Sequence, residues 1–227
     1  MNIKSPKIKT HFGFEQIDSD LKSKKVREVF DSVVEGYDLM NDLMSFGIHR
    51  IWKRIAVEMS EIRPNSYILD LAGGTGDMVR LMVPKISKEG LVILSDINEN
   101  MLVSGRDKLI DSGVTNFNSA QIDAQLLPFK KDTFDLISIA FGLRNVTDKK
   151  KTLRSILQCL KPGGRLIVLE FSKPTKEIIR EFYDLYSFEI IPKLGEIVLS
   201  SEESYRYLAE SIRMHPNQEE LKELFEE

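Results

Sequence analysis

The stretch Ser66 to Asp77, SYILDLAGGTGD, has the pattern of a strand, a tight turn and the start of a helix. Its apolar residues Tyr67 to Leu69 lead through Asp70 into AGGTG, after which apolar residues recur at helical spacing. Glycine can take positive φ and lets backbone N–H groups come close to a ligand. The stretch predicts a βα corner that binds a nucleotide, and a plain tight turn is the simpler alternative.

The spacing of the turn indicates which nucleotide it suits. A dinucleotide fingerprint needs a third glycine near Val79, and this chain has none there. The pattern D-x-A-x-G-x-G instead resembles the first motif of class I S-adenosylmethionine-dependent methyltransferases, with Ala72 where a glycine usually stands. The cofactor-binding candidates in this corner are Asp70, Gly73, Gly74 and Gly76.

Four further apolar stretches predict strands, and helical patterns separate them. The strands are expected at 91–96, 117–122, 134–140 and 165–171, and the helices at 77–86, 98–111 and 148–160. Such alternation predicts an α/β fold with a doubly wound, mostly parallel sheet, whose ligands bind outside the carboxyl ends of the strands. Asp96, Asp123-Ala124 and the segment 140–145 all fall at that edge.

Asp96 ends the second predicted strand, 20 residues after Gly76. In Rossmann-like folds an acid at this spacing accepts hydrogen bonds from a ribose. Capping of the following helix is the alternative role, but Asn98 stands in the better position for it. Asp96 is therefore a candidate ribose ligand.

Composition limits the function classes that the chain can have. With 227 residues and 42% apolar content, it has the size and the core of one large domain. Its 32 basic and 35 acidic residues are spread along the chain, which argues against a nucleic-acid partner. His11, His49 and His215 lack partners at metal-ligand spacing, so we expect no metal site.

The single cysteine, Cys159, lies in a helical run, where a small buried apolar residue is the ordinary reading, and it fits a reducing cytoplasm. No apolar run approaches the roughly 20 residues that span a bilayer. We expect one methyltransferase domain over 1–227. Its parts would be a mobile arm at 1–24, a helical lid at 25–60, the cofactor-binding core at 61–173 and a helical substrate-side region at 174–227.

The lid segment 37–55 mixes methionine and aromatic residues with polar ones, as a cover over a pocket would. Apolar stripes at helical spacing more often belong to a core, and this is the role we expect for Trp52 and Ile55.

Four longer segments carry a resemblance to the ubiquinone/menaquinone biosynthesis C-methyltransferase family, which covers almost the whole chain. They are His11–Phe14, HFGF; Tyr37–Lys53, YDLMNDLMSFGIHRIWK; Phe141–Asp148, FGLRNVTD; and Ser204–Leu208, SYRYL, which continues through Met214-His215-Pro216. The glycine turn is common to a superfamily, whereas these segments are typical of one family.

The resemblance implies methyl transfer from S-adenosylmethionine to a ring carbon of a polyprenylated quinol in ubiquinone or menaquinone biosynthesis. The acceptor would be a 2-methoxy-6-polyprenyl-1,4-benzoquinol or demethylmenaquinol. The family's cofactor contacts fall on Thr75, Asp96, Asp123 and Ala124. A serine contact of the family falls on Ala140, where only a backbone contact remains.

A quinol ring carbon becomes a good nucleophile when a neighbouring hydroxyl loses its proton, so the enzyme must position the reactants and assist that loss. Arg144, after the fourth strand, is the candidate for stabilising the phenolate, directly or through water, with Asn145 orienting it. Tyr37, His49 and Tyr205 are candidates for lining the quinol side. A lid or packing role is the alternative for each of them.

The family, as the resemblance implies it, continues into two more strands, which this chain does not show. A catalytically silent Rossmann-like partner of quinone-pathway enzymes, docking through an open sheet edge, is therefore the alternative function. A nicotinamide-dependent oxidoreductase is not supported, because the turn lacks the third glycine of the dinucleotide fingerprint.

The polyprenyl tail implies a cytoplasmic protein in transient contact with the inner face of the membrane, and we expect 40–52 and 178–199 to border the mouth for the tail. The open edge implies a homodimer or a complex with other quinone-biosynthesis enzymes.

Overall fold

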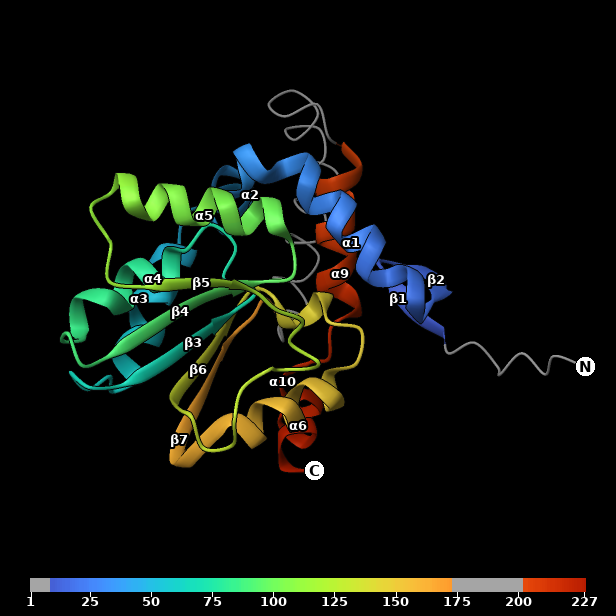
Figure 1. Cartoon of the computed structure of the whole chain (residues 1–227). Helices are drawn as coiled ribbons and strands as arrows, with labels where there is room; N and C mark the ends of the chain where they lie inside the picture. The colour runs from blue at the N-terminus through green and yellow to red at the C-terminus, as the bar shows by residue number, and fades with distance from the viewer. Residues whose placement is uncertain (1–8, 173–201) are drawn as a thin grey trace, which may run out of the picture. The chain divides into compact units, whose positions relative to one another are not determined.

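The computed structural model describes residues 9–172 and 202–227. Its main sheet consists of five parallel strands in the order β5-β4-β3-β6-β7 (Figure 1). The strands are β3 (Tyr67–Leu71), β4 (Leu91–Asp96), β5 (Asn118–Gln121), β6 (Phe134–Ala140) and β7 (Leu160–Leu169). The chain order reverses between β3 and β6, so the predicted α/β sheet is confirmed and the ligand crevice is expected where the neighbouring ends of these strands diverge.

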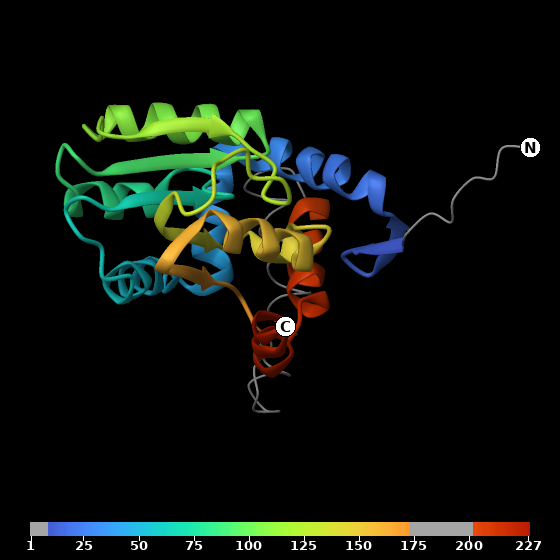
Figure 2. The same ribbon diagram turned by 60° about the horizontal axis from the view of Figure 1, so that its bottom comes forward.

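Helices cover the sheet on both faces, because alternate residues of each strand point to opposite sides. Helices α3 (His49–Met59), α4 (Asp77–Met82) and α5 (Glu99–Asp111) share one buried cluster with strand residues of a single face. The strand residues of that cluster are Ile68, Val92, Leu94 and Leu136. Figures 1 and 2 show α6 (Lys149–Cys159) on the other side of the sheet. The buried position expected for Cys159 is confirmed.

Two element boundaries differ from the predicted ones by several residues, for local reasons. The helix predicted over 77–86 ends at Met82, and a 3-10 turn, η2 (Val83–Lys85), follows because Pro84 cannot continue the α-helical hydrogen bonds. Strand β7 begins at Leu160, but its register against β6 slips until Arg165 pairs with Leu136. The residues of the slip include Gly163, which has φ +78°.

The described residues form two compact units, 37–171, which contains the main sheet, and 9–36 together with 172 and 202–227. In the second unit β1 (Lys9–Phe12) and β2 (Glu15–Asp18) form an antiparallel hairpin. Helix α1 (Ser19–Val33), a 3-10 turn η1 (Val34–Gly36), α9 (Glu202–Met214) and α10 (Gln218–Glu226) complete its described elements. Residues 9–24 of the arm predicted at 1–24 lie in the hairpin and the first part of α1.

Long-range contacts explain why the hairpin escaped sequence reasoning. The rings of Phe12 and Tyr207 stack with centroids 4.2 Å apart, and the Phe14 amide donates to Glu210 Oε2 at 3.1 Å. The hydroxyls of Ser32 and Ser204 lie 2.8 Å apart. Partners almost 200 positions away stabilise a segment that has little apolar periodicity of its own.

The predicted lid consists of helix α2 (Tyr37–Ser45), a turn at 46–48 and helix α3. Phe46 and Gly47 both have positive φ in that turn. The core role expected for Trp52 and Ile55 is wrong, since their side chains are 38% and 50% exposed. The buried side of α3 carries His49, Lys53, Ala56 and Val57 instead. The expected segment 178–199 lies outside the described residues.

Candidate functional site

The glycine turn after β3 is packed so tightly that side chains larger than those present would collide. Gly74 and Gly76 have φ of +51° and +80°, and Ala72 takes +50° although it carries a Cβ. A Cβ at Gly73 would lie 2.7 Å from Asp70 Oδ2, and one at Gly105 of α5 would lie 2.3 Å from the Gly74 carbonyl. The Gly73 amide donates to Ser95 O at 2.8 Å and ties the turn to β4.

Asp70 lies directly beneath this turn and is fully buried. Its Oδ1 accepts a hydrogen bond from the Ser138 hydroxyl at 2.6 Å, while Oδ2 has no hydrogen-bond partner within the described residues. Burial raises the pKa of this carboxyl to about 7, and Ser138 and Lys53 oppose the rise. A cationic ligand group would stabilise the ionised carboxylate, so Asp70 fits the ammonium end of an amino-acid-bearing cofactor.

Asp96 ends β4 at the same turn and is 9% exposed. Its Oδ2 accepts from the Gly74 amide at 3.0 Å and its Oδ1 accepts from the Asn98 amide at 2.9 Å. Burial raises its pKa, and these backbone hydrogen bonds counteract the effect. Asn98 caps α5 through the Met101 amide, as expected, so Asp96 is not needed as the cap. The remaining lone pairs of Asp96 suit the two hydroxyls of a ribose.

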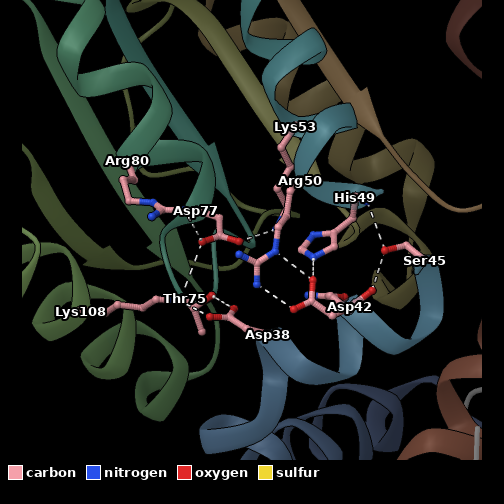
Figure 3. A network of polar contacts seen from close by, with 11 residues as sticks. Asp38, Asp42, Ser45, His49, Arg50, Lys53, Thr75, Asp77, Arg80 and Lys108 are labelled. Carbon is pink, nitrogen blue, oxygen red and sulfur yellow. Dashed lines mark hydrogen bonds and ion pairs between the residues drawn. The ribbon is translucent and has the colours of Figure 1, made fainter. Parts of the chain in front are cut away.

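Thr75 is buried in the turn, and its hydroxyl donates to Asp38 Oδ1 of α2 at 2.9 Å (Figure 3). The other oxygen of Asp38 pairs with Lys108 of α5. This hydrogen bond and ion pair connect the start of α2 with the glycine turn and α5. Sequence reasoning missed Asp38 as a partner of Thr75, although it lies within the family segment that begins at Tyr37.

Asp123 and Ala124 follow the end of β5, and Ala140 is the last residue of β6, at the same edge of the sheet as the turn. Asp123 accepts from the backbone amide of Gln125 at 2.9 Å and is half-buried, which orders the loop after β5. Ala124 and Ala140 are half-buried too. The edge predicted from strand alternation therefore carries these residues together with Asp70, Thr75 and Asp96.

Arg144 lies in the 3-10 turn η3 (Leu143–Asn145) after β6 and is 3% exposed. Its Nη1 donates to Glu170 Oε1 at 2.7 Å and to the Phe141 carbonyl, and its amide donates to Glu170 Oε2 at 3.1 Å. Phe141 takes φ +58°, an uncommon conformation for a bulky residue, and its ring stacks on Phe171 at 4.5 Å. Glu170, which sequence reasoning missed, fixes the guanidinium of Arg144.

Asn145 closes the same turn, and its amide donates to the Gly142 carbonyl at 3.1 Å. Tyr37, at the start of α2, is buried, and its ring approaches within 3.8 Å of the position that a Cβ on Gly74 would take. Burial raises the pKa of Tyr37, and the charge of Arg144 lowers it. Arg144, Asn145 and Tyr37 therefore belong to the same end of the sheet unit. Tyr205 is a buried residue of the other unit.

A network of charged side chains connects α2 and α3 with the start of α4 (Figure 3). Asp42 accepts from His49 Nε2 at 2.8 Å and from Arg50 through Nε at 2.9 Å and Nη2 at 2.7 Å. Arg50 above all lowers the pKa of Asp42 to about 2. Lys53 donates to Asp77 Oδ2 at 2.8 Å, which contributes to the lowered pKa of Asp77. These carboxylates are ionised and held in place.

Within the described ranges, no group of three or more histidine, cysteine or acidic side chains could hold a metal ion. No helix in the described part of the chain is long and apolar enough to cross a bilayer.

Comparisons with known proteins agree with this geometry. The model of the ubiE/COQ5 methyltransferase family matches residues 18–227. The Ubiquinone/menaquinone biosynthesis C-methyltransferase UbiE of Methylococcus capsulatus is 58% identical over 96% of this chain and 88% of its own length. The enzyme of the same name from Proteus mirabilis is 55% identical over 96% of this chain and 87% of its own length.

Solved structures support the fold alone. A SAM-dependent methyltransferase from Aquifex aeolicus matches with a TM-score of 0.54 and 18% identity, over 62% of this chain and 75% of that one. A SAM-dependent methyltransferase of Thermotoga maritima, described as a possible histamine N-methyltransferase, matches with a TM-score of 0.58 and 19% identity, over 88% and 78% of the two chains.

Proposed function

The chain belongs to the ubiE/COQ5 methyltransferase family, and from this membership we propose how its residues carry out methyl transfer. It is an S-adenosylmethionine-dependent C-methyltransferase of ubiquinone and menaquinone biosynthesis, and its substrate is a polyprenylated quinol. We propose 2-methoxy-6-polyprenyl-1,4-benzoquinol or demethylmenaquinol as the acceptor. The bound cofactor supplies a methyl group on a positively charged sulfur.

Two buried carboxylates beside one glycine turn are the observation that supports the assignment of the cofactor site. Asp96 would accept hydrogen bonds from the ribose hydroxyls, and Asp70 would face the cationic amino-acid end through Oδ2, which has no partner in the described part of the chain. Gly73, Gly74 and Gly76 let the turn pack closely against the side chains of Leu94, Met101 and Leu109. Thr75, Asp123, Ala124 and the backbone of Ala140 would complete the contacts along this edge.

Arg144 would act on the acceptor. Its guanidinium is held by Glu170 at 2.7 Å and by the Phe141 carbonyl, so its direction is fixed before substrate arrives. A fixed positive charge beside a quinol oxygen stabilises the phenolate that makes the ring carbon nucleophilic. Asn145 would orient that oxygen, and Tyr37 and His49 would line the quinol side.

An exposed apolar stripe on α3 supports transient contact with the membrane surface. We call it the α3 stripe, and its members are Ile48, Ile51, Trp52, Ile55 and Met59, each 38% to 67% exposed. Exposed Arg50 and Arg54 stand among them in a chain whose net charge is −3. An amphipathic helix with this composition binds to the interface of an anionic bilayer, where a polyprenyl quinol is dissolved. We propose the inner face of the cytoplasmic membrane as the place of this contact.

The outer side of β7 supports a proposal on assembly. Strand β7 pairs only with β6 among the described strands, and its residues Leu166 to Leu169 are half-buried. An open edge is a template for pairing with another chain. We propose a homodimer, or a complex with other enzymes of quinone biosynthesis, formed along this edge, and sedimentation of the purified chain measures it.

Complementation tests the proposed function most directly. Cells that lack their own quinone C-methyltransferase are given this chain, and mass spectrometry identifies the quinones that they make. Methylated ubiquinone or menaquinone is the expected product, and which of them appears identifies the acceptor. A chain that binds S-adenosylmethionine but restores neither quinone, and transfers no labelled methyl group to quinols in vitro, would be a silent binder.

A further inference from the structure

The contact between Asp42 and His49 fixes which ring nitrogen of His49 carries a proton. Asp42 is ionised, because Arg50 donates two hydrogen bonds to it. An ionised carboxylate can only accept hydrogen bonds, so Nε2 of His49, 2.8 Å from Oδ1, must be the donor. In the neutral imidazole the lone pair then lies on Nδ1. The Ser45 hydroxyl, which accepts from the His49 amide at 3.2 Å, further fixes the start of α3.

Nδ1 of His49 is a buried acceptor without a hydrogen-bond partner in the described part of the chain. The side chain is 1% exposed, and its ring meets Phe141 edge-on with centroids 6.4 Å apart. Phe141 directly follows β6, between that strand and Arg144, so the ring lies at the acceptor end of the sheet unit. Buried acceptors are almost always satisfied, and one that is not calls for a donor from outside the chain. A quinol hydroxyl is such a donor.

The reaction needs a base that can accept this proton. A phenolic hydroxyl has a pKa near 10, so few quinols are ionised at neutral pH. Arg144 cannot accept a proton, because its guanidinium has no free lone pair. Burial lowers the pKa of His49 and the nearby charge of Lys53 lowers it further, whereas Asp42 and Asp77 raise it. The ring is therefore neutral and able to accept a proton at pH 7.

We propose that His49 is the general base of the methyl transfer and that Asp42 is the residue that positions it. The inference rests on the proposed function, because it names the base for that same reaction. Nδ1 takes the proton of the quinol hydroxyl, the electron pair stays on oxygen, and His49 becomes an imidazolium next to Asp42. Once the ring carbon holds the methyl group and the carbon–sulfur bond is broken, the hydrogen of that carbon leaves as a proton. His49 returns the first proton to oxygen, so one proton is released overall.

Nitrogen-15 NMR of the protein without substrate tests the tautomer. With through-bond assignment of the three histidines, wild-type His49 should show a protonated Nε2 and an unprotonated Nδ1 at pH 7. Asp42→Asn should shift the titration of His49 to lower pH, because the carboxylate that stabilises the imidazolium is gone. A proton on Nδ1 in the neutral wild-type protein would overturn the proposal, whatever the variants do.

Kinetics test the base itself. His49→Gln should lose about 100- to 10,000-fold in kcat at pH 7 and keep its affinity for S-adenosylmethionine within about twofold. The loss should shrink as pH rises towards 10, because the quinol then ionises without help. A structural role would give the same loss at every pH. The matched control is His11→Gln, an exposed histidine of β1, which should behave as wild type at all pH values.

Asp42→Asn separates positioning from packing. It should lower kcat by about tenfold and move the acid limb of the rate profile to lower pH, in line with the lower pKa of His49. An unchanged acid limb together with a normal kcat would remove Asp42 from the mechanism. If wild-type protein methylates no quinol at all, the proposed function fails. If wild-type protein methylates quinols and His49→Gln does so at the same rate at pH 7, the inference about the base fails and the proposed function stands.

Discussion

The acidic residues at the cofactor turn and those on the α2–α3 segment behave in opposite ways. Asp70 and Asp96 are buried beside backbone and hydroxyl donors, and burial raises the pKa of each. Asp42 on α2 and Asp77 at the start of α4 are paired with Arg50 and Lys53, and the pKa of each is lowered. Neither acid of the first pair forms an ion pair within the described residues, although the charge of Lys53 acts on Asp70, whereas each acid of the second pair is ion-paired.

We propose that this difference in pKa separates acids that bind the cofactor from acids that position a neighbouring side chain. A carboxylate whose positive partner must come from a ligand gains most when a cationic cofactor arrives, since the desolvation that raises its pKa is then offset. A carboxylate that is already paired gains nothing from a cation, but it can fix the direction of a neighbouring side chain, as Asp42 does for His49 and Glu170 does for Arg144. Variants of the cofactor-turn acids should therefore lower cofactor affinity, whereas variants of the positioned side chains should lower kcat.

The largest effect, a loss of kcat, is expected from Arg144→Lys, because Glu170 positions the side chain of Arg144. The change keeps the charge but loses the planar fork that contacts Glu170 and the Phe141 carbonyl. We expect kcat to fall about 100- to 1000-fold, as when a fixed donor to a developing anion is removed, with cofactor affinity within about twofold. Steady-state kinetics and calorimetry measure the two. The exposed Arg154→Lys on α6 is the control, and a wild-type rate for Arg144→Lys would contradict the role.

A smaller effect, on cofactor affinity rather than on kcat, is expected from Asp96→Ala. It removes an acceptor that we propose for the ribose, and hydrogen bonds to a charged group contribute about 1.5–3 kcal/mol. Calorimetry should show S-adenosylmethionine affinity about 10- to 150-fold weaker. Asp107→Ala, at an exposed acid of α5, is the control. Unchanged affinity in a folded Asp96→Ala protein would place Asp96 outside the site and would break the comparison.

Asp70→Asn tests the raised pKa through stability. Folded Asp70 keeps its proton up to about pH 7, whereas in the unfolded chain it loses the proton near pH 4. The free energy of unfolding that this protonation contributes is full below pH 4 and is lost as pH rises through 7. The difference corresponds to about 4 kcal/mol, and a buried amide N–H₂ without a partner costs about 1–3 of it. Asp70→Asn should therefore be more stable than wild type by about 1–3 kcal/mol at pH 8.

Urea unfolding at pH 5 and pH 8 measures this change. The gain of Asp70→Asn over wild type should decrease or reverse at pH 5, where wild-type Asp70 is protonated. The same difference at both pH values would show that the carboxyl has an ordinary pKa. Ser138, which donates to Oδ1, can still donate to the amide oxygen, so loss of that hydrogen bond would not explain the result.

Sequence reasoning predicted the sheet because its signals are local. Each strand is a short apolar run between a helical pattern and a polar residue, and the order of strands and helices leaves few topologies open. The glycine turn, Asp96 and the edge that carries Asp123 follow from the same rule. The prediction that Asn98 rather than Asp96 caps α5 is confirmed, because the Asn98 side chain accepts from the Met101 amide.

The parts that sequence reasoning missed depend on distant partners. In the sequence Glu170 is only the end of a predicted strand, and its contact with Arg144, 26 positions earlier, is visible only in the structure. Trp52 and Ile55 have the periodicity of a core face, but the side of α3 that faces the sheet carries His49 and Lys53. An apolar stripe indicates that a helix is amphipathic and does not by itself say which side meets water.

That exposed stripe provides the last test, at the acceptor end. If the α3 stripe enters a bilayer surface, Ile55→Ser removes a half-exposed side chain that contributes about 1 kcal/mol to binding, since full burial of an isoleucine is worth about 1.5–3. Sedimentation with vesicles containing anionic lipid should show binding about fivefold weaker. The control is Ile110→Ser, because Ile110 is 49% exposed near the C-terminal end of α5. Equal losses at Ile55 and Ile110 would mean that α3 has no special affinity for lipid, whereas a loss at Ile55 alone would put the membrane contact at the end where the quinol is bound.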